Sequence, residues 1–249
     1  MPIRDTLQSI QDALVSSTKE SRDCSQVGGY FAMVHPADPL VWLNYAVPTS
    51  EPSAVDTANL VNHFARIGRT PRLEFFTDLW PSVEPILLGA GFVCEKRMPV
   101  MVLNSQDRKS RVGVHFAREA TSDDLTEARY VSNVAFGMPE LDPNPDEQAQ
   151  AALESGRHLL SVVEIDGLIV GSGYAVGTNS VREIAGIGTL PEYRRQGLAT
   201  AVIEELLDRF FRGGGEIAWL TPGDEGAQSL YQGLGFQPIA EQVCYSIPN

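Results

Sequence analysis

The chain of 249 residues is long enough for one large domain or two small ones, and its 43% hydrophobic content is ordinary for a globular protein. A formal net charge of −13 excludes a broad nucleic-acid-binding surface, which would need clustered positive charge. No apolar run is long enough to span a membrane, and residues 1–20 are too polar for a secretory signal peptide. The cysteines Cys24, Cys94 and Cys244 are odd in number and far apart, which predicts a reducing, cytoplasmic location.

The first half of the chain alternates helical and strand patterns. Apolar residues at helical spacing predict a helix within Met1–Glu20, before the breaker Gly28-Gly29. The next predicted elements are strands at Tyr30–His35 and Val41–Val47, a helix at Ala54–Ile67 ended by Gly68, a strand at Leu73–Thr77, a short helix at Val83–Leu88 and a strand at Val100–Leu103.

A polar, charged stretch, Asn104–Arg111, predicts a linker to the second half. The elements predicted after it are a strand at Val112–Phe116, a helix from Asp123 or Asp124 through Phe136, a stiff proline-rich loop at Gly137–Pro145, and strands at His158–Ile165 and Leu168–Val176. The dipeptide Asp166-Gly167 predicts a tight hairpin turn between those two strands.

The two halves contain an internal repeat. Leu73–Phe92 aligns without a gap on Ile217–Phe236, which places Leu87 opposite Tyr231 and Gly91-Phe92 opposite Gly235-Phe236. The repeat predicts two tandem domains of one fold, covering residues 1–105 and 112–249 and joined by a linker at 106–111. An unrelated N-terminal α/β domain is the alternative.

The second half contains a strand–turn–helix pattern suited to binding an anion. Ile184–Leu190 is apolar, is bounded by a proline and is too short for a helix, so it predicts a strand. From Leu198 one apolar helical face continues until Gly213–Gly215 ends it. Arg195–Thr200 then spans the first helical turn, where unpaired N–H groups and the helix dipole favour a pyrophosphate. The alternative is an ordinary strand–turn–helix connection whose arginines are solvated and bind no ligand.

Other chemistries have little support in the sequence. The Rossmann fingerprint fails because Pro191 stands where a third glycine is needed, and the chain has no Gly-Lys-Ser/Thr of a P-loop. The four histidines are isolated from one another, so no metal-ligand set is predicted.

Two linked motifs resemble the GNAT superfamily of acetyl-CoA-dependent N-acetyltransferases. Arg194-x-x-Gly197-x-Ala199 is similar to the family's phosphate-binding element, and Leu230–Phe236 is similar to its late Leu-Tyr-x-x-x-Gly-Phe element. The resemblance implies an α/β (α+β) fold class, in which each domain is a mixed, mainly antiparallel sheet flanked by helices. It also implies acetyl-CoA as cosubstrate and no metal.

The resemblance assigns residues to the acetyl-CoA site. Backbone N–H groups of Ile187, Gly188 and Thr189 would meet the cofactor and the acetyl oxygen, so their identities would matter little. Asp224 stands where many members have an asparagine that contacts the pantetheine arm. The positions that would hold the pyrophosphate are Arg194, Arg195, Gln196, Gly197, Leu198, Ala199 and Thr200.

It also assigns catalytic roles. Tyr231 would donate a proton to the departing thiolate, although the same tyrosine could simply pack in the core. Glu183 would act as general base, often through water, although an exposed strand-end carboxylate is an equal alternative. Glu140 and Asp142 are weaker candidates for holding a cationic acceptor.

These features predict an N-acetyltransferase that moves an acetyl group from acetyl-CoA to a primary amine of a small molecule or peptide by direct attack. An acyl-CoA-binding sensor without turnover is the alternative, and a longer acyl chain stays open. The predicted protein is a monomer or homodimer with no nucleic-acid or membrane partner. The first domain should bind no cofactor, because Thr49–Ala54 lacks the arginines and glycine of the motif and Leu87 replaces the tyrosine.

Overall fold

The computed structural model describes residues 2–19, 21–109, 113–145 and 147–248, and these form two compact units. Unit 1 comprises the described residues within 1–101, 221–223 and 238–249, and unit 2 comprises those within 102–220 and 224–237. Among the described residues, no helix combines the length and apolar character that crossing a membrane requires.

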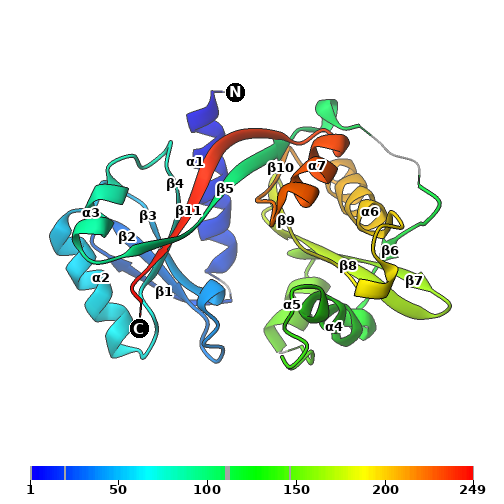
Figure 1. Ribbon diagram of the computed structural model, residues 1–249, viewed down its shortest axis with the longest axis horizontal. Helices are drawn as coiled ribbons and strands as arrows, with labels where there is room; N and C mark the ends of the chain where they lie inside the picture. Colours follow the sequence, from blue (N-terminus) through cyan, green and yellow to red (C-terminus); the bar gives the residue numbers. More distant parts are fainter. Residues whose placement is uncertain (1, 20, 110–112, 146, 249) are drawn as a thin grey trace. The chain divides into compact units, whose positions relative to one another are not determined.

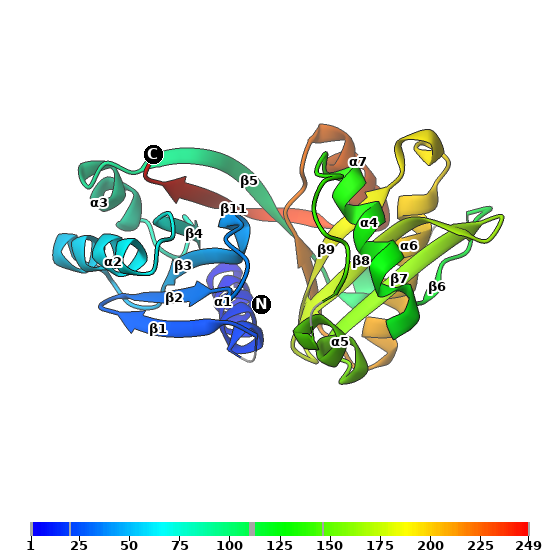
Figure 2. The ribbon, with the colours of Figure 1, turned by 90° about the horizontal axis from the view of Figure 1, so that it is seen from below.

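Unit 1 is a sheet with helices on both faces. Its strand order is β1 (Asp23–Val27), β2 (Tyr30–Val34), β3 (Asn44–Pro48), β4 (Arg72–Phe76) and β11 (Gln237–Ser246), with β3 and β4 parallel and the other neighbours antiparallel. Its helices are α1 (Ile3–Thr18), α2 (Ala54–Arg66) and α3 (Val83–Gly89). Figure 1 shows α1 on one side of the strands and α2 and α3 on the other. Figure 2 shows β1, β2 and β3 side by side.

Alternation along β2 explains why both faces are covered. Met33 packs with Tyr45 and with Leu14 of α1, whereas the Tyr30 hydroxyl lies 2.9 Å from the Thr57 hydroxyl of α2. Residues an odd number apart on a strand point to opposite faces, so β2 contributes to two layers of core. The helices predicted in this half are confirmed, each within a few residues of its expected bounds.

Three strands of unit 1 differ from prediction. Val41–Leu43 is a 3₁₀ turn rather than the start of a strand, because the Asn44 side-chain amide donates to the carbonyls of Asp38 and Leu40 and holds the chain curled. The edge strand β1 has no clear apolar alternation and was not predicted. β5 spans Val93–Leu103 rather than Val100–Leu103, and its charged, exposed first half hid the strand pattern.

The C-terminal strand lies in unit 1, although the predicted second domain, 112–249, included it. Gln242–Ser246 of β11 pairs antiparallel with Arg72–Phe76 of β4, and the Tyr245 ring stacks on Phe75 at 6.1 Å. The Tyr245 hydroxyl donates to Glu84 at 2.5 Å, and Arg97 forms ion pairs with Glu84 and Glu241. Without β11, the edge of β4 would expose unpaired backbone groups, so the pairing stabilises the sheet of unit 1.

Unit 2 has the same layered plan. Its strand order is β10 (Ile217–Leu220), β9 (Val181–Thr189), β8 (Leu168–Gly177), β7 (His158–Ile165) and β6 (Arg118–Glu119), antiparallel except for β9 and β10. Its helices are α4 (Leu125–Ala135), α5 (Glu147–Glu154), α6 (Leu198–Arg212) and α7 (Glu225–Leu234). Figure 1 shows α4 and α6 on opposite sides of β8 and β9. The predicted hairpin is confirmed, with Asp166 and Gly167 at φ 52° and 80°.

The segment that leads into unit 2 differs from prediction. Of the predicted strand Val112–Phe116, residue 112 lies outside the described residues and residues 113–117 form no strand; the short strand β6 follows instead. The described part of the predicted linker, 104–109, is held against α6, because Arg108 forms ion pairs with Glu204 at 2.5 Å and Asp208 at 3.3 Å. The helix α5 was not predicted.

The repeated segments share a backbone hydrogen bond as well as their order of elements. In unit 1, β4 leads to α3, and the N–H of Phe92 donates to the carbonyl of Leu87 at 3.0 Å. In the second segment, β10 leads to α7, and the N–H of Phe236 donates to the carbonyl of Tyr231 at 3.1 Å. Gly91 and Gly235 both have positive φ, at 86° and 106°, which is the left-handed conformation that ends a helix. The two segments therefore share the local backbone geometry of a helix that ends at a glycine.

Candidate active site

The site begins where β9 parts from its parallel neighbour. β10 pairs with β9 only at Val181, Arg182 and Glu183, whereas β9 continues to Thr189. Its other edge stays paired with β8 as far as Thr189, with a register shift opposite Ser172–Tyr174 where Gly186 takes φ 60°. Such a bulge re-aims the backbone. The edge of residues 184–189 is therefore left without a β10 ladder, and it is here that the backbone contacts to the acetyl group are predicted.

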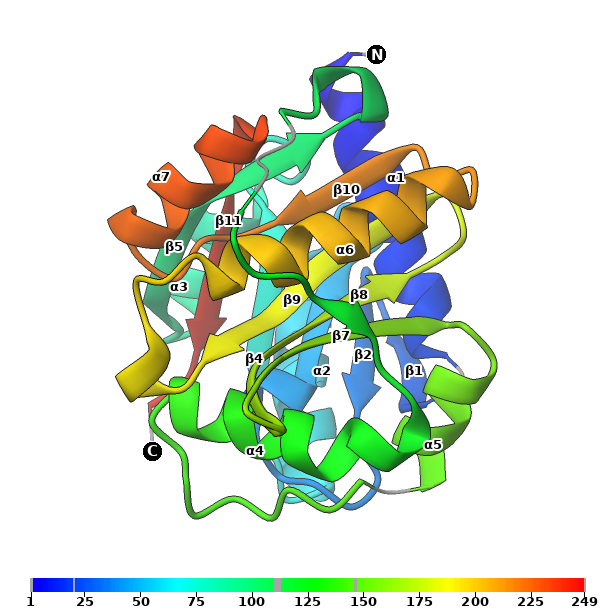
Figure 3. The same ribbon diagram turned by 90° about the vertical axis from the view of Figure 1, so that its right-hand side faces the viewer.

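The helix that follows β9 has an open N-terminus. Gly197, the first residue before α6, has φ 84°, and no side chain caps the helix. Space around Gly197 is open, since an added Cβ would meet no atom within 4 Å. Leu198 is buried at 1% exposure and anchors the first turn, while Arg195, Gln196 and Gly197 are exposed. Uncapped N–H groups at a helix start, together with the helix dipole, form an anion site. Figure 3 shows β9 running through its loop into α6.

The two predicted phosphate-binding arginines differ in their surroundings. The Arg194 guanidinium donates to the Thr189 carbonyl at 3.3 Å and to the Ala135 carbonyl at 3.2 Å, which ties the end of β9 to the end of α4. Arg195 has φ 61° and makes no hydrogen bond or ion pair within the part of the chain that the structure describes. Arg194 therefore braces the loop, and Arg195 is the more available of the two for an anion.

Gly188 has a role that the prediction did not give it. A Cβ at this position would lie 3.0 Å from the Ala135 Cβ and 3.3 Å from the Ser132 Cα of α4. The neighbouring Ile187 side chain, on the other face, occupies the space left by Gly173. The backbone of β9 can approach α4 closely only because residue 188 has no side chain. The identities of these residues therefore matter to the packing of the site.

Tyr231 lies on α7 with 8% of its surface exposed and its ring edge-on to Phe236 at 5.8 Å. Burial, helped by the negative charge of Asp224, raises the pKa of the Tyr231 phenol to about 12. Its hydroxyl has no hydrogen-bond partner among the described residues. A buried phenol that stays protonated and has a free hydroxyl can act as a proton donor.

Asp224 has a structural task. Its carboxylate accepts a hydrogen bond from the Ala227 N–H at 2.8 Å and so caps the N-terminus of α7. Aspartate and asparagine are equally good capping residues, so the aspartate keeps the cap that an asparagine would provide.

The carboxylates proposed for the acceptor side fall into two groups. Glu183 is half-buried on β9, at the last position paired with β10 and opposite Val176 of β8. In the loop after α4, Glu140 is exposed, and the Asp142 carboxylate accepts hydrogen bonds from the Asn144 N–H and side-chain amide, both at 2.9 Å. Glu183 thus lies where β9 and β10 part, whereas Asp142 shapes its own loop.

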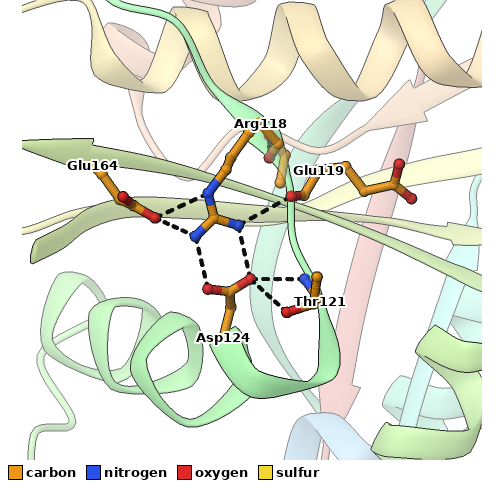
Figure 4. Close-up of polar contacts among 6 residues, drawn as sticks. Arg118, Glu119, Thr121, Asp124 and Glu164 are labelled. Atoms are coloured by element: carbon orange, nitrogen blue, oxygen red, sulfur yellow. Dashed lines mark hydrogen bonds and ion pairs between the residues drawn. The ribbon is translucent and has the colours of Figure 1, made fainter. Parts of the chain in front are cut away.

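The start of α4 is held by an ion-pair cluster that the sequence did not suggest (Figure 4). The Arg118 guanidinium donates to both oxygens of Asp124 at 2.8 Å and forms an ion pair with Glu164. The Asp124 carboxylate also accepts from the Thr121 N–H at 2.7 Å, which completes a capping box. These bonds, chiefly the one to Arg118, lower the pKa of Asp124 to about 2. The Thr121-x-x-Asp124 spacing was the available signal.

The structure also bears on two other expectations. Among the described residues, no three His, Cys, Asp or Glu side chains converge as metal ligands would. The predicted cofactor residues on β9 and at the start of α6 lie together in unit 2, and Tyr231 lies in the same unit.

The comparisons with known proteins concern the family and the fold. The sequence matches the Acetyltransferase (GNAT) family over residues 123–236. The structure is similar to a GCN5-related N-acetyltransferase from Kribbella flavida, with a TM-score of 0.80, 23% identity and coverage of 98% of this chain and 96% of that one. It also resembles a GCN5-related N-acetyltransferase from Sphaerobacter thermophilus, with a TM-score of 0.62, 15% identity and coverage of 89% and 78%.

A third similar structure is a tandem GNAT protein from the clavulanic acid biosynthesis pathway, with a TM-score of 0.61, 12% identity and coverage of 90% of this chain and 80% of that one. A search of curated proteins found no significant sequence match. At these identities the structural likeness establishes the fold, and the family match covers the segment that contains the site.

Proposed function

Because the chain belongs to the GNAT superfamily of acetyltransferases, we propose that it moves the acetyl group of acetyl-CoA to a primary amine of a small molecule or peptide. The observation that carries the proposal is the uncapped N-terminus of α6 beside the unpaired edge of β9. The first can hold the diphosphate of the coenzyme, and the second can hold the acetyl carbonyl. Both would bind through backbone groups, and their packing requires a small residue at Gly188.

The proposed reaction is a direct attack. The acceptor's ammonium loses a proton to Glu183, directly or through water, and the neutral amine attacks the acetyl carbon. A C–N bond forms, the C–S bond breaks, and the thiolate takes the proton of the Tyr231 hydroxyl. Backbone N–H groups of residues 187–189 would stabilise the oxyanion, an effect worth about 3 kcal/mol per donor in other enzymes. The attacking nitrogen then loses its second proton, which returns through water to Tyr231. The products are an N-acetylated amine, free CoA and the one proton that Glu183 releases to solvent.

We also propose that only unit 2 binds acetyl-CoA and that unit 1 is a degenerate copy of the same domain. In unit 1 the equivalent helix start is occupied by the protein itself, because the Ser53 hydroxyl accepts from the Asp56 N–H and the Asp56 carboxylate accepts from the Ser53 N–H. A carboxylate there also repels a diphosphate.

Isothermal titration with acetyl-CoA, followed by an amine screen that reads CoA thiol release, tests the proposal. We expect one binding site per chain and thiol release with at least one amine. A folded protein that does not bind acetyl-CoA would contradict the whole proposal. Binding without thiol release from any amine would favour the alternative, an acyl-CoA sensor. Two sites per chain would contradict the assignment of unit 1.

A further inference from the structure

Three arginines lie on or beside α4, and two of them make hydrogen bonds or ion pairs within the protein. Arg118 pairs with Asp124 at the start of the helix, and Arg194 donates to the Ala135 carbonyl at its end. Arg129, between them, is half-buried and makes no hydrogen bond or ion pair within the part of the chain that the structure describes. A guanidinium has five N–H donors and carries its charge at all working pH values, so a half-buried one without a partner is suited to an anionic ligand.

Tyr174 adds a second donor, on β8, on the side of the sheet that α4 covers. Its ring packs against the α4-side core that contains Ala128 and Val131, and a Cβ added to Gly186 would lie 3.1 Å from the ring. The hydroxyl has no hydrogen-bond partner among the described residues. Burial raises the pKa of Tyr174 to about 12, while the positive charge of Arg129 opposes that rise, so the two groups lie within electrostatic reach of each other. Tyr174 thus presents a neutral O–H donor.

Both groups lie on the face of the sheet that also carries Glu183. The Ser172 hydroxyl donates to the Ala128 carbonyl of α4 at 2.9 Å, which shows that Ser172 faces α4. Tyr174 is two residues further along β8, so it faces the same side, and it pairs with Ala185 of β9. Glu183, two residues before Ala185, shares that face. The charge of Arg129 and the hydroxyl of Tyr174 therefore lie on the same side of the sheet as Glu183, the proposed general base. An acceptor would reach Glu183 from this side.

Resting on the proposed function, we infer that the acceptor amine also carries an anionic group, in the first place a carboxylate, held by Arg129 and the Tyr174 hydroxyl. The forked geometry of a guanidinium matches a carboxylate, and a phenol O–H can donate to the same oxygens. The chain carries a net charge of −13, which disfavours anions in general. Binding one therefore requires a local positive group such as Arg129.

Matched acceptors test the inference. The probes are amino acids, their carboxamides and an aminoalkyl phosphate, with CoA thiol release as the readout. We expect the carboxylates to be acetylated in preference to the carboxamides. For a carboxylate acceptor, Arg129→Gln should raise KM about tenfold to a hundredfold with a smaller change in kcat, because one charged anchor is lost. Arg129→Lys should restore part of the affinity, and Tyr174→Phe should raise KM less than Arg129→Gln does.

The controls separate this inference from the proposed function. Arg66→Gln removes an exposed arginine from α2 of unit 1. It should leave the KM for the carboxylate and the KM for the carboxamide unchanged. Equal use of carboxamides and carboxylates, with Arg129→Gln indistinguishable from wild type, would overturn the inference but leave the transferase proposal standing. Preference for the phosphate would assign a phosphate as the anion. If acetyl-CoA binds but no probe releases thiol, the same carboxylates are titrated directly into the wild-type and Arg129→Gln proteins. Equal affinity for the two proteins would overturn the inference.

Discussion

Two helices hold equivalent places in the two units, yet their N-termini are built differently. In unit 1, α2 begins at Ser53 with a complete capping box, and hydrogen bonds from Ser53 and from the Gly29 backbone lower the pKa of the Asp56 carboxyl. In unit 2, α6 begins at Gly197 with no side-chain cap. The first helix has side-chain partners for its terminal N–H groups, whereas the second has no side-chain cap among the described residues. A helix start that is to bind an anion through its N–H groups must lack the side-chain cap that would otherwise stabilise it.

The same contrast recurs at two further pairs of positions. Leu87, fully buried in unit 1, corresponds to Tyr231, whose hydroxyl makes no hydrogen bond to any residue that the structure describes. Counting back from Pro48 and Pro191, Tyr45 in the core of unit 1 corresponds to Gly188, which lets β9 approach α4. Unit 1 has side chains that fill space, and unit 2 has groups that leave a donor or a backbone accessible.

The largest expected effect is at Tyr231. Tyr231→Phe keeps the buried ring but removes the proton donor, so kcat should fall about 10²-fold or more while KM for acetyl-CoA changes little. Because burial raises the pKa of Tyr231 to about 12, deprotonation of this phenol should cause no loss of kcat between about pH 7 and about pH 10 in the wild type. Steady-state kinetics across pH measure both. Unchanged kcat at every pH would assign Tyr231 to the core alone.

The second-largest effect is expected when a carboxylate like that of Asp56 in unit 1 is introduced at the equivalent helix position in unit 2. Thr200 is the third residue after the N-cap Gly197 of α6, as Asp56 is the third after the N-cap Ser53 of α2. Thr200→Asp would therefore put a negative charge at the uncapped start of α6. The affinity for acetyl-CoA should fall about tenfold to a hundredfold, while the thermal midpoint should stay the same or rise, because an acidic residue favours a helix start. Isothermal titration and thermal unfolding measure the two effects. Thr200→Ser is the matched control, and equal affinity in both variants would place the diphosphate elsewhere.

Filling the space at Gly188 should have an intermediate effect. In Gly188→Ala the new methyl group meets the Ser132 backbone and the Ala135 Cβ, so α4 must move outward. We expect a loss of stability of about 1–3 kcal/mol and roughly a tenfold fall in kcat/KM. Gly167→Ala in the β7–β8 hairpin strains a turn in the same unit and controls for stability alone. If both variants keep full activity, close packing of β9 on α4 is not needed for catalysis.

The smallest effect is expected in unit 1. Ser53→Ala removes the cap of α2 and should lower stability by about 1 kcal/mol, measured as a shift of the unfolding midpoint in urea. The affinity for acetyl-CoA should not change. Ser50→Ala, at an exposed residue nearby, is the control. Appearance of a second acetyl-CoA site in Ser53→Ala would show that unit 1 retains binding capacity behind its cap.

Local patterns in the sequence determined most of the elements and the place of the site. The apolar face from Leu198 and the glycines that follow predicted α6, observed at Leu198–Arg212, and Asp166-Gly167 predicted the hairpin. The motif that is predicted to bind phosphate lies directly before and at the start of that helix. These features depend on residues within about four positions of one another, so propensity, periodicity and turn chemistry are enough to reveal them.

Only the tertiary structure decided which strands pair and which side chains are free. The pairing of β11 with β4 joins residues such as Phe76 and Gln242, far apart in the sequence, and the choice depends on which sheet edge is open. The parting of β9 from β10 and the hydrogen bond from Arg194 to the Ala135 carbonyl are equally non-local. So is the lack of a partner for Arg129 among the described residues. A residue's partners are set by the packing of distant segments, and no short-range pattern encodes that packing.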